Sequence, residues 1–139
     1  MAKTPRFETP SERIEIRGIV KENHRIILEL FHRYLGTQAD SREAVAQLIL
    51  DRLASHLEMG ERVLFQAIRQ LEPRGQTVIE DAEVEHEEVK HMIRELQVAE
   101  SDDDQSWDEL FEDMMETARV LFVTEEQDLL PLIDDSLNL

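Results

Sequence analysis

The chain has 139 residues, a length typical of one domain, and it contains no cysteine, so disulfides and thiolate metal sites are excluded. Its formal charge is −17, from 32 acidic and 15 basic residues, and such an acidic surface repels the phosphates of nucleic acids and anionic membranes. No apolar run approaches the roughly 18 residues of a transmembrane helix, and the first ten residues lack the apolar stretch of a secretory signal. We therefore expect a cytoplasmic protein that has neither nucleic acid nor membrane as a partner.

The first half of the chain predicts two long helices. The first helix is expected over residues 10–35, with Thr9 as its N-cap and Pro10 at the first position, where the missing N–H costs nothing. The second is expected over residues 41–71, with Asp40 as its N-cap and an end before Pro73.

The second half predicts two more helices. The third is expected over residues 78–100, with Thr77 as its N-cap, and the fourth over residues 107–135, with Ser106 as its N-cap. Pro131 lies near the end of the fourth helix and is expected to kink or shorten it. Short connections between long helices imply antiparallel neighbours. The prediction is thus an all-α, up-down-up-down antiparallel four-helix bundle that forms a single domain over residues 1–139.

Each predicted helix places one metal-competent side chain on its apolar, inward face, because side chains three, four and seven residues apart share a face. These side chains are His24, His56, His86 and Glu125. At a rise of about 1.5 Å per residue, their heights along the bundle agree well enough for them to meet. An unpaired buried carboxylate costs several kcal/mol, so a bound cation would explain all four positions together.

Three further residues are predicted to lie away from this layer. The helical angle turns His91 away from the inward face and leaves His32 on its flank, so both are expected at the surface or in a second layer. Trp107, at the start of the fourth predicted helix, is expected to cap the core.

With these positions the chain resembles the hemerythrin-like, HHE cation-binding family. The resemblance covers nearly the whole chain and rests on the segments "KENHRIILELFHRYL", "SHLEMGERVLFQAI", "VEHEEVKHMIREL" and "VTEEQDLLPLI", in that order. It implies a four-helix bundle holding a non-haem di-iron centre bridged by carboxylates. Members of the family carry or sense oxygen, respond to redox state or nitric oxide, or handle iron. The family's metal ligands are matched by His24, His56, His86 and Glu125.

Two positions depart from the family pattern. The carboxylate expected four residues after His56 is Gly60, and the histidine expected four residues before Glu125 is Leu121. Glu61, beside the first gap, faces away from the site in a regular helix and would reach a metal only through a π turn or a local rotation. What remains is at most a three-histidine, one-carboxylate set for one metal, or a weakened metal pair. Natural loss and engineered replacement of ligands would give the same two differences.

Three functions are open at this point. The first is a hemerythrin-like protein that binds one or two non-haem irons, or zinc or manganese instead. Such a protein would bind a small diatomic ligand such as oxygen, sense redox state or nitric oxide, or handle iron. The second is a degenerate bundle without a tightly bound metal, serving as a structural or protein-interaction module, in which protonated imidazoles pair with Glu125. An oxidase or peroxidase ranks last because the sequence offers no separate substrate machinery, and we expect the chain not to be an enzyme.

Overall fold

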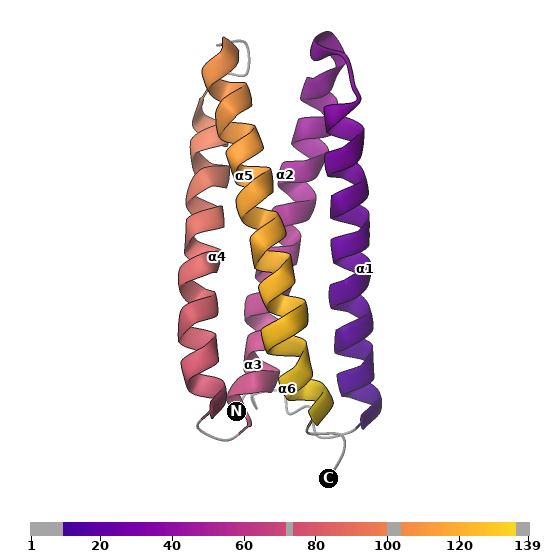
Figure 1. Ribbon diagram of the computed structural model, residues 1–139, viewed down its shortest axis with the longest axis vertical. Coiled ribbons are helices and arrows are strands. Elements are labelled where there is room, and N and C mark those ends of the chain that lie inside the picture. The colour runs from indigo at the N-terminus through magenta and orange to yellow at the C-terminus, as the bar shows by residue number, and fades with distance from the viewer. Residues whose placement is uncertain (1–9, 72–73, 100–103, 136–139) are drawn as a thin grey trace, which may run out of the picture.

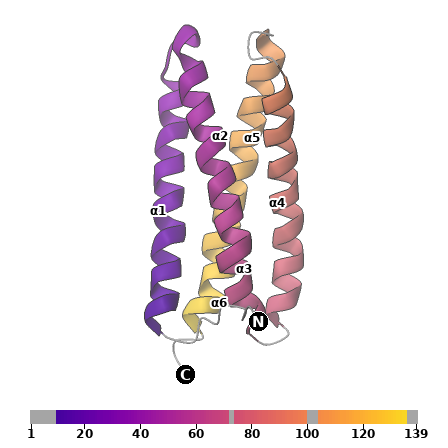
Figure 2. The same ribbon diagram turned by 180° about the vertical axis from the view of Figure 1, so that it is seen from behind.

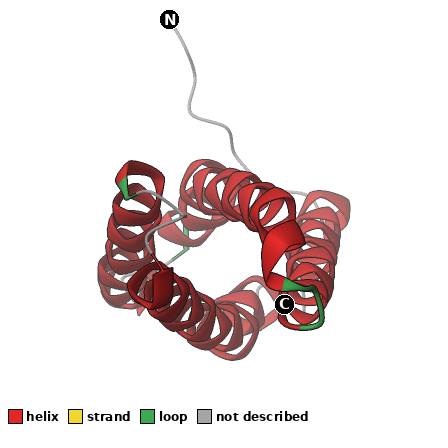
Figure 3. Cartoon of the chain, turned by 90° about the horizontal axis from the view of Figure 1, so that it is seen from above, coloured by secondary structure: helices red, strands yellow, loops and turns green. Residues whose placement is uncertain are grey.

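The computed structural model describes residues 10–71, 74–99 and 104–135, and these residues form helices with no strand among them (Figure 1). Four rods run alternately up and down and surround a common axis (Figure 3). The main helices are α1 (Pro10–Leu35), α2 (Arg42–Met59), α4 (Arg74–Val98) and α5 (Asp104–Thr124). The fold is thus the predicted all-α four-helix bundle. No helix in the described part of the chain is long and apolar enough to cross a membrane.

Two of the rods contain a π-helical turn. The turn η2 (Gly60–Leu64) joins α2 to the short helix α3 (Phe65–Arg69), and the turn η3 (Glu125–Leu129) joins α5 to α6 (Leu130–Asp135). Figure 2 shows α2 and α3 as one continuous rod when the bundle is seen from behind. A π turn closes on the residue five positions back, so each turn holds one residue more than an α-helical turn.

Three helix starts differ from those predicted. Residues Ala39–Ser41 form a 3-10 turn, so Ser41 rather than Asp40 precedes α2. The helices α4 and α5 begin at Arg74 and Asp104, which puts Thr77 and Ser106 inside them rather than at their N-caps. Thr9 and Pro73 lie outside the described residues.

The early start of α4 has a packing reason. A Cβ added to Gly75 would lie only 2.6 Å from the carbonyl oxygen of Ile68, so the absence of a side chain lets the first turn of α4 approach α3 directly. The local cap motif at Thr77 gives no information on this contact between Gly75 and Ile68. For α5, acidic residues before Ser106 are favourable in the first turn of a helix, and the helix extends back to include Asp104.

Pro131 does not shorten the fourth rod, which continues to Asp135. The π turn η3 ends two residues before the proline, and the N–H of Leu130 bonds to the carbonyl oxygen of Glu125. A proline lacks an N–H and crowds the preceding turn. The wider π turn lies where that crowding would occur.

The core consists of two apolar clusters with one polar layer between them. On α1, for example, Val20 belongs to one cluster and Ile27 to the other, and the buried His24 lies between them. The same order holds on the other three rods, where the buried polar residues are His56, His86 and Glu125. The fold therefore places the four side chains singled out from the sequence at one level of the bundle.

Candidate metal centre

Three imidazoles and one carboxylate meet in the interior of the bundle. The Nε2 atoms of His24 and His56 each lie 2.7 Å from Oε1 of Glu125, and Nε2 of His86 lies 3.3 Å from Oε2. Each of the four residues is at most 2% exposed. Ligand atoms of His24, His56 and Glu125 all lie within 4.8 Å of one another. These three side chains lie close enough to share one cation, and His86 lies beside them against Oε2 of Glu125.

Glu125 supplies a negative charge at the centre of this cluster. Burial by itself raises the pKa of the Glu125 carboxyl, but hydrogen bonds from His24, His56 and His86 outweigh burial and hold that pKa well below its usual range. The carboxylate is therefore ionised at neutral pH. Together with three imidazoles it forms a donor set with a net charge of −1 when the rings are neutral.

His24 lies between two carboxylates. Its Nε2 is 2.7 Å from Glu125 and its Nδ1 is 2.7 Å from Oε2 of Glu126. A neutral imidazole carries one N–H, so it can donate to only one of these two acceptors. Unless the group takes up an extra proton, the other contact places a nitrogen lone pair against a carboxylate. A cation at Nε2 would remove that conflict, and Nδ1–H would then donate to Glu126.

The outer nitrogens of the other two imidazoles differ, because only that of His56 has a hydrogen-bond partner among the described residues. Nδ1 of His56 lies 3.1 Å from the side-chain nitrogen of Asn23, which donates to it. Nδ1 of His86 has no hydrogen-bond partner among the described residues, and Oε1 of Glu61 lies 3.7 Å from it. Turning the Asn23 amide over would present its oxygen to Nδ1–H of His56 and free the Nε2 lone pair. Such outer partners orient histidine rings at metal sites.

Glu61 does not join the inner cluster. The second rod contains the π turn that the prediction required for its approach, but the side chain does not reach Glu125. The N–H of Gly60 still bonds to the carbonyl oxygen of His56, and Glu61 follows as the second residue of the π turn. The Glu61 side chain is 31% exposed and pairs with Nζ of Lys90 at 2.5 Å. It therefore lies behind His86, on the side away from Glu125.

The two π turns are arranged alike. Each begins four residues after a position where the family pattern has a histidine: η2 follows His56, and η3 follows Leu121. The second residue of each turn is a glutamate that faces the outer nitrogen of a histidine on a neighbouring helix. The second rod thus has the histidine, His56, but no inner carboxylate at Gly60. The fourth rod has the carboxylate, Glu125, but a leucine in place of the histidine.

Apolar groups close the site. Phe122 stacks on His24, with ring centroids 4.2 Å apart, and meets His56 edge-on at 5.3 Å. Phe65 packs 4.6 Å from His86. The side chain of Leu121 is 1% exposed and belongs to one of the core clusters. The cluster is therefore screened from water above and below, which strengthens its electrostatic interactions.

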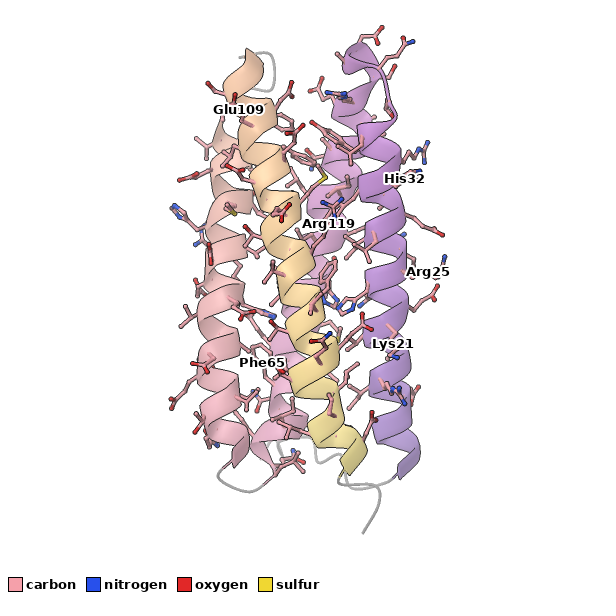
Figure 4. All side chains as sticks on the ribbon, in the orientation of Figure 1. Lys21, Arg25, His32, Phe65, Glu109 and Arg119 are labelled. Atoms are coloured by element: carbon pink, nitrogen blue, oxygen red, sulfur yellow. The ribbon has the colours of Figure 1, made fainter. Side chains whose placement is uncertain are left out.

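The sequence pattern did not reveal the outer partners Asn23 and Glu126 or the stacked Phe122. The one available signal was that Glu126 directly follows Glu125. The three residues set apart from the layer lie as predicted. His32 projects outward from α1 (Figure 4), His91 is 66% exposed beside Glu95, and the indole N–H of the buried Trp107 donates to the carbonyl oxygen of Leu96.

Comparison with protein families agrees with this geometry. The family model described as the hemerythrin HHE cation binding domain matches residues 16–133, a span that includes all four converging side chains. No curated protein and no solved structure gives a significant match to the chain.

Proposed function

We propose that this chain, which belongs to the hemerythrin HHE cation-binding domain family, binds a single non-haem metal ion in its buried cluster. Membership of the family makes the chain a hemerythrin-like metal-binding protein. The ligands that we assign to the ion are His24, His56, His86 and Glu125.

The observation that carries the proposal is the position of His24 between Glu125 and Glu126. A ring that faces acceptors at both nitrogens is suited to holding a cation at one nitrogen while donating from the other. The outer nitrogen of His86, which has no hydrogen-bond partner in the described part of the chain, fits the same state, because Nδ1–H would then point toward Glu61. The donors present therefore fit a metal ion.

One metal fits better than two. A di-iron centre needs further ligands at positions 60 and 121, and these are Gly60 and Leu121. The His86 ring lies against Gly60, and Leu121 is packed in the core. The second ion would therefore lack both a carboxylate and an imidazole.

Iron is the ion that we propose, with zinc and manganese as ions that the same donors accept. Bound iron would supply a centre that changes oxidation state and responds to small ligands such as oxygen or nitric oxide. The chain's own residues would orient and shield it: Glu126 and Asn23 hold the rings, and Phe122 excludes water. The role that follows is sensing of oxygen, nitric oxide or redox state, or iron handling, rather than catalysis.

The test is metal analysis of the chain after separate loading with ferrous iron, zinc and manganese. We compare His86→Gln with His91→Gln, which removes an exposed histidine from the same helix. We expect about one ion per chain for the original protein and for His91→Gln, and a loss of binding for His86→Gln. Fewer than about 0.2 ions per chain with all three metals would overturn the proposal.

One observation favours a metal-free alternative. The Asn23 amide donates to Nδ1 of His56, and this leaves Nε2–H of the same ring to donate to Glu125. For this imidazole, hydrogen bonding is complete without a metal. The cluster would then be a structural element of an interaction module, and the loading experiment separates the two functions.

A further inference from the structure

We propose that Gly60 is a positioning residue of the metal centre, because the absence of a side chain there lets His86 reach its place beside Glu125. The inference rests on the proposed metal centre and assigns a role to a residue that supplies no ligand itself. It also gives a reason for a glycine in the middle of a long rod.

The backbone does not explain this glycine. Gly60 has φ −56° and ψ −47°, ordinary right-handed helical values that any residue adopts. A glycine inside a helix is less favourable than alanine because it loses more backbone freedom on folding. The reason for a glycine must therefore lie in the space around its Cα.

That space is taken by His86. A Cβ on residue 60 would lie 3.1 Å from Cε1 of the imidazole and 3.7 Å from its Nε2. The first distance is shorter than an ordinary carbon–carbon contact, so the ring would have to move. Cε1 is bonded to Nε2, so the displacement would act directly on the atom assigned as a ligand.

The ring has little room to move away. His86 is 0% exposed, and Phe65 packs against it with the ring centroids 4.6 Å apart. Its Nε2 already makes the longest of the three contacts to Glu125, at 3.3 Å against 2.7 Å for His24 and His56. A further shift would therefore lengthen the contact to Glu125 that is already the longest of the three.

Gly18 provides a matched comparison. It also lies inside a helix, α1, but it is exposed, and a Cβ there would meet nothing within 4 Å. Both glycines lie within a helical rod, and only Gly60 has an imidazole in the place of its side chain. Replacing each with alanine separates the helical effect from the effect on the site.

The first experiment measures zinc affinity by competition with a chromophoric chelator, and the visible spectrum of the cobalt-loaded chain. We expect Gly60→Ala to weaken zinc binding about tenfold or more and to shift the cobalt bands, as changes next to a ligand do. Gly18→Ala should leave both unchanged. Equal zinc affinity and an unchanged cobalt spectrum in Gly60→Ala would overturn the inference and leave the proposed function standing.

The second experiment tests the contact without metal, by urea unfolding of a double-mutant cycle. In the original background, Gly60→Ala should raise the urea midpoint less than Gly18→Ala does, or lower it. In a His86→Ala background, where the ring is gone, Gly60→Ala should raise the midpoint as Gly18→Ala does. The same rise in both backgrounds would overturn the inference. Failure of the original chain to bind metal would instead count against the proposed function.

Discussion

Replacing Glu125 with glutamine removes the only charge from the centre of the cluster while nearly keeping its shape. Three imidazole nitrogens lie within 3.3 Å of this carboxylate, and the residue is 0% exposed. A hydrogen bond to a charged group contributes about 1.5–3 kcal/mol. The carbonyl oxygen of glutamine still accepts from two rings, so the loss is equivalent to about one such bond. Glu125→Gln should thus lower the free energy of unfolding of the metal-free chain by about 3 kcal/mol.

The loss should depend on pH in a defined direction. The pKa of Glu125 in the folded chain lies well below the usual value of 4.5. Its stabilising effect is therefore fully present above the unfolded value, where both states are ionised. As pH falls below that value, the unfolded chain takes up the proton first and the stabilisation is lost. The difference between the original protein and Glu125→Gln should shrink accordingly.

Urea unfolding followed by helical circular dichroism, in the presence of a chelator, measures this difference at pH 6.5 and at pH 3.5. Glu116→Gln, an exposed change on the same rod, serves as the control and should shift the free energy of unfolding by less than about 0.5 kcal/mol. A loss below about 1 kcal/mol for Glu125→Gln at pH 6.5 would refute the assigned role of the carboxylate. So would a loss that is equal at the two pH values.

Three other outcomes are expected. Burial is the main reason that the pKa of Tyr34 is raised to about 12, so the unfolded chain ionises first and stability falls as pH rises from 10 toward 12. Tyr34 is the only tyrosine, and a tyrosinate absorbance midpoint at 10 in the folded chain would contradict this. Trp107→Phe removes the hydrogen bond to the carbonyl oxygen of Leu96 and should cost about 1–3 kcal/mol in urea unfolding; a smaller cost would mean that the bond contributes little. Gly60→Glu displaces the His86 ring, so alone it should not raise the iron content. With Leu121→His added, the new carboxylate and the new imidazole offset the displaced ring, and the iron content should rise toward two ions per chain. Metal analysis checks this, and no rise in the double variant would mean that these positions do not correspond to family ligands.

Helical periodicity was sufficient to predict the bundle and the facing of its polar layer. His24, His56, His86 and Glu125 each lie among apolar residues at helical spacing, and this local pattern needs no knowledge of the neighbouring helices. Their convergence at one level followed from helix lengths and short connections. Both kinds of information are present in a single sequence.

The positions of the π turns could not be predicted from the same helical periodicity. A regular helical period predicts Val63 on the inward face of the second rod, but Val63 is only half-buried, and Leu64 and Phe65 are buried instead. The extra residue in η2 shifts the inward face by one position from there on. The N-cap prediction at Thr77 failed for a related reason: a cap motif is local, while the start of α4 depends on the approach of Gly75 to Ile68.

The polar layer also bears on the order of events in folding. Its members come from residues 24 to 125, so the layer is complete only when the first and last rods lie side by side. Contacts this distant in sequence form late, since the long loop between them must close first. An ion held by all four side chains would stabilise the native chain but not a partly assembled one. Its binding would then act on the rate of unfolding and leave the rate of folding almost unchanged.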